Sequence, residues 1–182
     1  AGMPAEIQVS PIADGGEGTT EALVNGLSGY LETVTVSDPL GRKQTANYGI
    51  LPSGTAVMEM AAAAGLPLLS ESERNPLYTT TFGVGEMIAD AIAKGCRKFI
   101  IGIGGSATND GGVGCLQALG FSFRNADDTE IPCGAVGLSQ LQKITAENVL
   151  PELSACTFQV ACDVTNPLCG EQGCSAVFAP QK

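Results

Sequence analysis

Apolar and polar positions along the chain follow two different periods, and the switches between them predict strands and helices. Residues 6–10 and 30–51 alternate at every second position, which is typical of half-buried strands. The turn sequence "DPLG" at 38–41 interrupts the second stretch, so a hairpin or two paired strands are expected there. Continuous apolar runs at 97–105 and 156–164 predict strands that are buried inside a sheet.

Helical spacing fills the segments between these strands. Residues 19–27 place Ala22, Leu23 and Leu27 on one helical face before Gly29. The further predicted elements are an amphipathic helix at 79–95, a strand passing into a helical turn at 55–65, helices at 110–120 and 135–144, and a short strand at 121–123. Because strands and helices alternate, the predicted fold class is α/β, with a mostly parallel or mixed sheet flanked by helices.

Composition limits the classes of function. At 182 residues the chain is long enough for one sizeable core, or for one domain plus part of another. Its formal charge of −10, from 9 basic and 19 acidic residues, disfavours binding to nucleic acid or anionic lipid. No apolar run reaches the ~20 residues of a membrane span, and the first residues lack the pattern of a signal peptide. These features predict a cytoplasmic protein with no membrane or nucleic-acid partner.

Seven cysteines and no histidines are present. The cysteines are odd in number and form no C-x-x-C pair, so neither a disulfide framework nor a zinc site is expected. Cys169 and Cys174 are close in sequence, but an isolated pair cannot complete a tetrahedral zinc site. We therefore expect reduced thiols, several of them buried as small apolar groups.

Carboxylates accompany three of the predicted strands. Asp14 and Glu17 follow the first strand, Asp110 follows the run at 97–105, and Asp163 lies at the end of the last run. In open α/β sheets, ligands bind at the carboxyl ends of the strands. The three loops are therefore expected to converge on one ligand.

The most unusual of these loops is "GIGGSATNDGG" at 102–112, which contains five glycines. Glycine lets the backbone approach a ligand closely, and the following helix offers free N–H groups to a phosphate or carboxylate. Ser106, Thr108 and Asn109 add side-chain donors. The alternative is a tight strand-to-helix turn in which Ser, Thr, Asn and Asp cap the helix. Neither the GxxxxGK[ST] pattern nor the complete dinucleotide fingerprint is present, so the pattern alone leaves both interpretations open.

The carboxylates suit one kind of chemistry. Phosphoryl transfer to an alcohol needs an acceptor for the hydroxyl, a divalent cation on the phosphates, and donors that offset the spreading charge. Asp110, Asp14, Glu17 and Asp163 are the right residue type for the first two tasks. Taken singly, each is equally well explained as a solvated cap or turn residue.

Three motifs resemble the glycerate kinase family, in its bacterial two-domain class I type. They are "PIADGGEGTTEAL" at 11–23, "IIGIGGSATNDGGVGCLQALG" at 100–120 and "VACDVTNPLCGEQGCSAVFAPQK" at 160–182, and "EMAAAAGL" and "TTFGVGEMI" are similar to family segments too. The resemblance covers essentially the whole chain in order. It implies ATP-dependent, Mg²⁺-assisted phosphorylation of D-glycerate to phosphoglycerate, in glycerate, glyoxylate or sugar-acid breakdown, with D-glycerate and a nucleotide as small-molecule partners.

The resemblance also implies roles for the motif residues. Asp110 would align or deprotonate the substrate hydroxyl. Asp14, Glu17 and Asp163 would bind magnesium or position its ligands. Substrate and phosphate groups would be bound by Gly104, Gly105, Ser106, Thr108, Asn109, Gly15, Gly16, Thr19, Asn166 and Lys182.

The chain departs from the family in several places. Family members are much longer, open with a strand ending in Asp-Ser-(Phe/Tyr)-Lys, and continue into another glycine-rich and acidic region. Ala179 stands where a glycine is usual, which affects the shape of that loop. The chain is therefore expected to be an internal piece of a two-domain kinase with an interlobe cleft, and to be inactive alone. Residues 1–38 would belong to a first, Rossmann-like domain and residues 39–182 to a second α/β domain.

Two other functions are compatible with the same loops. One is a non-catalytic anion-binding regulatory module, and the other is a magnesium-dependent phosphatase that uses the carboxylates on water. A homo-oligomer is compatible with the sequence, and the sequence does not decide whether the 2- or the 3-hydroxyl is phosphorylated.

Overall fold

The central sheet is mixed, with an antiparallel half and a parallel half. In the computed structural model, which describes residues 15–182, the strand order is β1-β2-β3-β4-β7. β1–β2 and β2–β3 are antiparallel pairs, whereas β3–β4 and β4–β7 are parallel. The bounds are β1 Tyr30–Ser37, β2 Lys43–Ile50, β3 Thr55–Glu59, β4 Lys98–Gly102 and β7 Thr157–Ala161. The predicted α/β class with a mixed sheet is confirmed, while the strand predicted at 6–10 lies outside the described residues.

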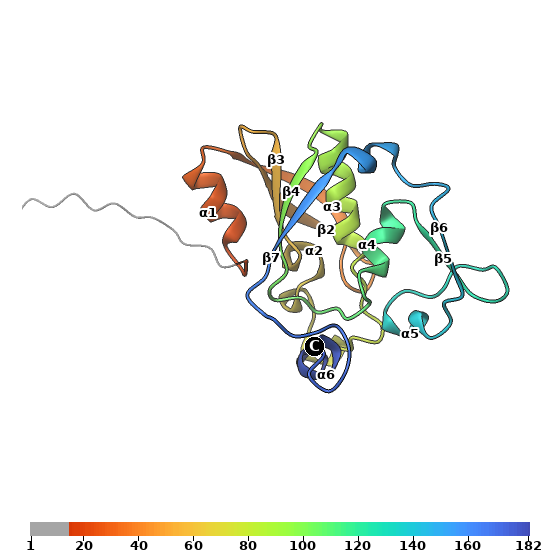
Figure 1. Cartoon of the computed structure of the whole chain (residues 1–182). Helices are drawn as coiled ribbons and strands as arrows, with labels where there is room; N and C mark the ends of the chain where they lie inside the picture. The colour runs from red at the N-terminus through yellow and green to blue at the C-terminus, as the bar shows by residue number, and fades with distance from the viewer. Residues whose placement is uncertain (1–14) are drawn as a thin grey trace, which may run out of the picture.

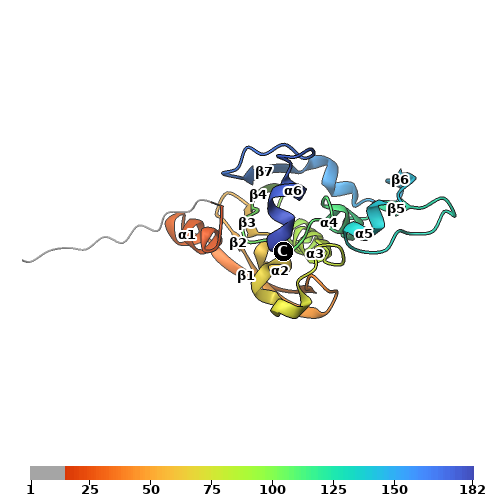
Figure 2. The ribbon, with the colours of Figure 1, turned by 90° about the horizontal axis from the view of Figure 1, so that it is seen from below.

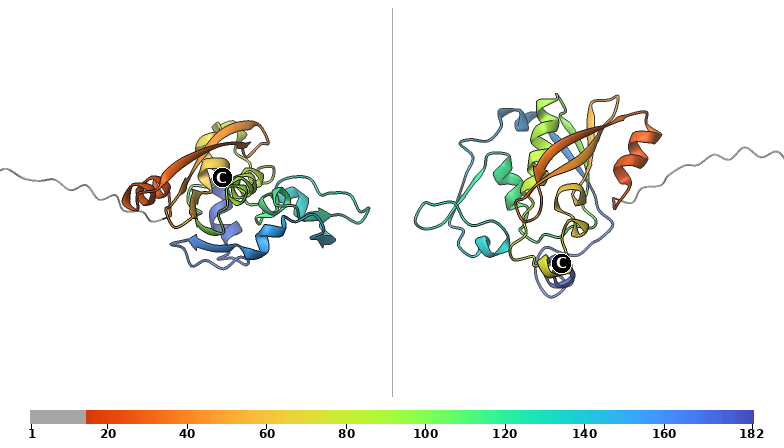
Figure 3. Two further views of the ribbon diagram at one scale, coloured as in Figure 1. Left: turned by 90° about the horizontal axis from the view of Figure 1, so that it is seen from above. Right: turned by 180° about the vertical axis from the view of Figure 1, so that it is seen from behind.

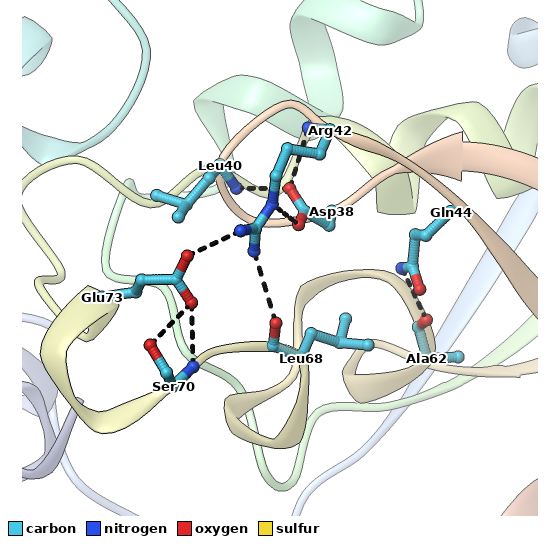
Figure 4. Close-up of polar contacts among 8 residues, drawn as sticks. All are labelled: Asp38, Leu40, Arg42, Gln44, Ala62, Leu68, Ser70 and Glu73. Carbon is cyan, nitrogen blue, oxygen red and sulfur yellow. Dashed lines mark hydrogen bonds and ion pairs between the residues drawn. The ribbon is translucent and has the colours of Figure 1, made fainter.

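The predicted hairpin is confirmed, and its turn is stabilised by polar contacts. β1 and β2 pair along the full length of both strands. In the turn, the Asp38 carboxylate accepts hydrogen bonds from the N–H groups of Leu40 at 2.8 Å and Arg42 at 2.9 Å. The guanidinium of Arg42 joins Asp38 to Glu73 and also reaches the carbonyl of Leu68 (Figure 4). The turn is thereby fixed to the segment that follows β3.

Helices cover the two faces of the sheet differently. α1 (Thr19–Gly26) lies on one face, and α3 (Phe82–Ala93) packs on the other, with α4 (Val113–Ala118) beside it (Figures 1 and 3). Neighbouring residues of β2 point to opposite faces of the sheet. Gly49 faces Val24 of α1, whereas Tyr48 points toward α3. Tyr48 is fully buried, and its hydroxyl donates to Asp90 at 2.7 Å. The main core fills the space between the sheet and α3.

The predicted helix starts and stops are largely confirmed. The strand-to-turn segment at 55–65 forms β3 and then α2 (Ala61–Ala64), and α3 ends before Gly95, whose φ of 94° suits glycine. In α1, however, the prediction for Leu27 is wrong. Its side chain is 54% exposed, and Val24, at 5%, lies against the sheet instead. Leu27 follows the last residue of the helix, so it has left the helical face.

A small second sheet stands beside α4. It consists of β5 (Ser122–Arg124) and β6 (Lys143–Thr145), with α5 (Ala135–Leu138) between them in sequence (Figure 1). The helix predicted at 135–144 is therefore too long. Ile144 pairs with Phe123 of β5, so the end of that segment is drawn into a strand.

Residues 156–164 contain a strand, as predicted, but that strand, β7, is not buried. β7 is the outermost strand of the sheet among the described residues, and Phe158 and Val160 are 40% and 57% exposed. Phe158 nevertheless stacks on the buried Phe99 of β4, with ring centroids 4.8 Å apart. The apolar residues of β7 therefore pack against β4, although the strand itself lies at the edge of the described sheet.

Two further properties concern the cysteines and the lengths of the helices. All seven cysteines are free thiols. Among the described residues, no helix is both long enough and apolar enough to cross a membrane.

Candidate functional site

The three loops predicted to converge do lie side by side. The N–H of Gly104 donates to the carbonyl of Gly15 at 3.3 Å. A Cβ atom on Gly102 would lie 2.4 Å from that same carbonyl oxygen, and one on Gly15 would lie 2.9 Å from the carbonyl oxygen of Ala161. Such separations exclude a side chain, so glycine is required where the loops meet at the ends of β4 and β7.

A cavity of about 610 Å³ opens beside this junction. The loop between β4 and α4, residues 103–112, forms one wall, and residues 162–164 form another. α6 (Cys174–Phe178) and residues 181 and 182, which lie beside it in the view from below, close a third side (Figure 2). Eight of the predicted site residues line this cavity: Gly104, Gly105, Ser106, Thr108, Asn109, Asp110, Asp163 and Lys182.

Lys182 contributes a cation to the cavity. Its Nζ donates hydrogen bonds to Ser106 Oγ at 2.6 Å and to the carbonyl of Thr108 at 2.9 Å. None of the salt bridges among the described residues involves this ammonium group. Burial lowers the pKa of Lys182, because desolvation disfavours its charge. The Asp110 carboxylate acts on this ammonium only through space and partly opposes the lowering of its pKa, so the half-buried ammonium, which forms no ion pair within residues 15–182, is suited to bind an anion.

Asp110 is 1% exposed and is surrounded by donors. The backbone N–H groups of Thr81, Gly112 and Gly114 donate to its carboxylate at 2.8, 3.0 and 3.2 Å. The hydroxyls of Thr81 and Thr80 donate to its Oδ2 at 2.9 and 3.4 Å. This is the environment of a carboxylate that caps helices, the alternative left open by the sequence. The role of Asp110 toward a substrate hydroxyl stays a prediction.

Asn109 is held by α6. Its side-chain amide exchanges hydrogen bonds with the Ser175 hydroxyl, at 3.1 Å as donor and 3.2 Å as acceptor. Together with the contacts of Lys182, this pair attaches the end of the chain to the loop between β4 and α4.

Four predicted binding residues make local contacts instead of lining the cavity. The buried hydroxyl of Thr19 accepts the N–H of Gly15 at 3.1 Å, and the N–H of Thr19 donates to the carbonyl of Gly16 at 3.3 Å. The side-chain amide of Asn166 donates to the carbonyl of Gln172 at 3.0 Å. These residues shape two of the converging loops.

Two of the three carboxylates predicted to bind magnesium, Glu17 and Asp163, line different cavities. Asp163 is exposed on the 610 Å³ cavity, whereas Glu17 lines a separate cavity of about 550 Å³ together with Glu59. Asp14 lies outside the described residues. Within residues 15–182, no group of three or more His, Cys, Asp or Glu side chains could hold a metal ion. Magnesium at nucleotide sites needs only one or two carboxylates besides phosphate oxygens, so Asp163 fits a site of that kind.

Sequence reasoning missed four residues that support the loop. Thr79, Thr80 and Thr81 precede α3 and bond to the loop between β4 and α4, and Ser175 holds Asn109. A signal was available, since three consecutive threonines at the start of the helix predicted at 79–95 indicate side chains that bond to backbone groups, and α3 itself begins only at Phe82. That signal does not reveal which distant loop the hydroxyls reach.

The parallel strands of the mixed sheet end at a cavity whose lining includes a half-buried ammonium and the side chains of Ser106, Thr108 and Asn109. These features define an α/β protein with an anion-compatible cavity at the carboxyl edge of its sheet. The chain belongs to the glycerate kinase family, whose sequence profile matches residues 1–182.

Relatives and a solved structure agree with this membership. The chain is 50% identical to a glycerate kinase of Haemophilus influenzae over 94% of its own length and 46% of that protein. It is 49% identical to a glycerate 2-kinase of Escherichia coli, covering 94% of the chain and 45% of that protein. A crystal structure described as a candidate glycerate kinase 2 of Salmonella typhimurium superposes with a TM-score of 0.91 at 50% identity, over 94% of this chain and 47% of the other. The chain thus spans about half the length of the proteins it matches.

Proposed function

We propose that this sequence supplies part of the active site of an ATP-dependent glycerate kinase, which transfers the γ-phosphoryl group of ATP to a hydroxyl of D-glycerate. The observation that carries the proposal is the cavity at the carboxyl edge, which gathers eight motif residues of a chain that belongs to the glycerate kinase family. In the reaction, the hydroxyl oxygen bonds to the γ-phosphorus, the bond between that phosphorus and the bridging oxygen of ADP breaks, and the hydroxyl proton is released to solvent.

Different residues of the cavity would bind the anionic groups, hold magnesium and align the substrate hydroxyl. Lys182 and Ser106, with the N–H groups of the glycine-rich loop, would bind anionic oxygens of a phosphate or of the glycerate carboxylate. Asp163 would hold magnesium, which when bound offsets charge on the phosphates. Asp110 is the candidate to align the hydroxyl, although its saturated contacts favour a supporting role.

The position of phosphorylation can also be proposed. The relative from Escherichia coli is named a glycerate 2-kinase and is 49% identical to this chain. We extend that regiochemistry to the present protein, with 2-phosphoglycerate as the product. Phosphorus NMR of the product distinguishes the 2-phosphate from the 3-phosphate, and 3-phosphoglycerate would contradict the extension.

The test of the activity uses the full-length gene product that contains this sequence. ADP release should require both D-glycerate and Mg²⁺, and phosphoglycerate should appear in equal amount. Phosphate release from phosphoglycerate without nucleotide would instead indicate the phosphatase. Nucleotide or glycerate binding without turnover would indicate the regulatory module.

The isolated 182-residue chain forms a second test. Because it spans about half of its relatives, we expect little or no glycerate-dependent ADP formation from it. Turnover close to that of the full-length protein would contradict the expectation of an incomplete active site. A cytoplasmic location belongs to the same proposal, and fractionation of the source cells would test it.

A further inference from the structure

Three consecutive threonines before α3 are buried against the loop between β4 and α4. Thr79, Thr80 and Thr81 are 0%, 3% and 2% exposed. Polar side chains at such depth are stable only when they are hydrogen bonded. Their hydroxyls meet this need with partners about thirty residues further along the chain, in the glycine-rich loop.

Thr79 fixes the middle of that loop. Its hydroxyl donates to the carbonyl of Ala107 at 2.7 Å, and Ala107 is fully buried. The two residues on either side of Ala107 provide the contacts of Lys182, through Ser106 Oγ and the carbonyl of Thr108. Together with the bond from the N–H of Ala107 to the carbonyl of Ala64 at 2.8 Å, this bond holds residue 107 inward, so that residues 106 and 108 face the cavity.

Thr81 fixes the end of the loop. Its N–H and hydroxyl both donate to the carboxylate of Asp110, at 2.8 and 2.9 Å, and the same hydroxyl accepts the N–H of Cys115 at 2.9 Å. Asp110 also accepts the N–H groups of Gly112 and Gly114 at the start of α4. One carboxylate and one hydroxyl thus join the beginnings of α3 and α4.

Thr80 attaches this assembly to the sheet. Its N–H donates to the carbonyl of Pro39 at 2.9 Å, within the hairpin turn that Asp38 and Arg42 stabilise. The loop is consequently held from the β1–β2 hairpin through the threonines, and not only by its own flanking elements.

We propose that Thr79 and Thr81 are positioning residues, which hold the loop between β4 and α4 through Ala107 and Asp110 so that Ser106 and Thr108 face the ligand of the cavity. The proposal rests on the proposed function for the identity of that ligand. It predicts that the threonine hydroxyls matter for turnover through the loop that they hold, because their hydrogen bonds go to Ala107, Asp110 and Cys115. Small displacements of binding groups lower turnover strongly, which gives the expected size of the effect.

The test uses four variants of the full-length protein, Thr81→Val, Thr81→Ser, Thr79→Val and Thr79→Ser, with Thr33→Val as the control. Thr33 lies on β1, where its hydroxyl bonds to the exposed side chain of Asn47. Each valine variant should lower kcat/KM for glycerate by about 10- to 100-fold at temperatures well below its melting temperature. Each serine variant keeps the hydroxyl and should recover to within about threefold, and Thr33→Val should match the wild type.

The outcomes separate positioning from stability. A lower melting temperature with unchanged kcat and KM per folded molecule in the valine variants overturns the proposal. If neither valine variant folds, the threonines serve the fold alone and the proposal is likewise overturned. If the wild type does not phosphorylate glycerate, the proposed function fails, and calorimetry with MgATP then tests the same variants for weakened binding.

Discussion

The Nζ atom of Lys182 lies 2.6 Å from Ser106 Oγ, which joins the last residue of the chain to the glycine-rich loop after β4. The two residues are 76 positions apart and belong to two different sequence motifs. The pair also gives the cavity the positive charge that the glycine-rich loop lacks, since residues 102–112 contain no lysine or arginine. The loop supplies directional donors, and Lys182 supplies charge.

Removing that charge should weaken anion binding. In the full-length protein, we expect Lys182→Met to raise KM for ATP or glycerate by about 10- to 100-fold, the usual worth of a hydrogen bond to a charged group. Steady-state kinetics with each substrate varied in turn measures the effect. Lys182→Arg keeps the charge and should be affected less. Equal KM values in Lys182→Met and the wild type would remove Lys182 from the binding site.

The same lysine predicts a pH dependence. Burial lowers the pKa of Lys182, so its ammonium loses the proton at a lower pH than an exposed lysine does. The protonated form binds the anion, and kcat/KM should therefore fall as pH rises through this lowered pKa. In Lys182→Arg the guanidinium stays protonated, so the alkaline fall should move to higher pH. An identical alkaline limb in both proteins would assign it to another group.

Asp110→Asn tests whether the buried carboxylate stabilises the fold or accepts the hydrogen bond of the substrate hydroxyl. The asparagine NH₂ group would face donors at Thr81, Gly112 and Gly114, so we expect the free energy of unfolding to fall by about 1–3 kcal/mol. Chemical denaturation and turnover should be measured on the same preparation. A loss of about 10²–10⁴ in turnover at unchanged stability would instead identify Asp110 as the acceptor for the substrate hydroxyl.

The cysteines should differ in reactivity. Cys133, Cys162 and Cys169 are exposed, whereas burial raises the pKa of Cys115 to about 12. Iodoacetamide at about pH 8 should label the three exposed thiols first and leave Cys115 unmodified. Cys162 lines the cavity, so MgATP or glycerate should slow its labelling but not that of Cys133. Mass spectrometry of the peptides gives each rate, and equal rates with and without ligand would place the ligand elsewhere.

A glycine inside α3 should resist substitution. A Cβ atom on Gly85 would lie 2.2 Å from the carbonyl oxygen of Cys115 and 2.7 Å from Ala118 Cβ, where α3 meets α4. Gly85→Ala should therefore lower the free energy of unfolding by about 1–3 kcal/mol, although alanine favours helices. Gly26→Ala at the end of α1, which has open space around it, is the matched control and should not destabilise. Similar melting temperatures of the two variants would contradict the close packing.

The sequence predicts the helices and strands of this fold better than it predicts which of them are buried. The hairpin, α3 and the succession of β3 and α2 follow from local periodicity, turn residues and stop signals, which act over a few positions. The burial of β7 does not, because it depends on the neighbours of that strand in the sheet. Phe158 and Val160 give the same apolar pattern whether the strand lies inside the sheet or at its edge.

The site shows the same division between local and distant information. The glycine-rich loop and Lys182 were found from motifs, and the structure places them together. The partners of Asp110 were not found, because Thr81 is 29 positions away and no local pattern specifies that contact. The division into two domains at residues 38 and 39 and the interlobe cleft stay predictions.

The order of strands in the sheet also has a consequence for the folding pathway. β1 and β2 are joined by a short turn, whereas β4 and β7 pair Lys98 with Thr157 across a much longer stretch of chain. Closing a longer loop costs more entropy, and parallel pairing across such a stretch is slow. Asp163 and Lys182 both follow β7, so we expect the hairpin to form early and the cavity to be completed last. During folding, ligand binding at the cavity would then report that β7 and the residues after it, up to Lys182, have packed onto the rest of the sheet.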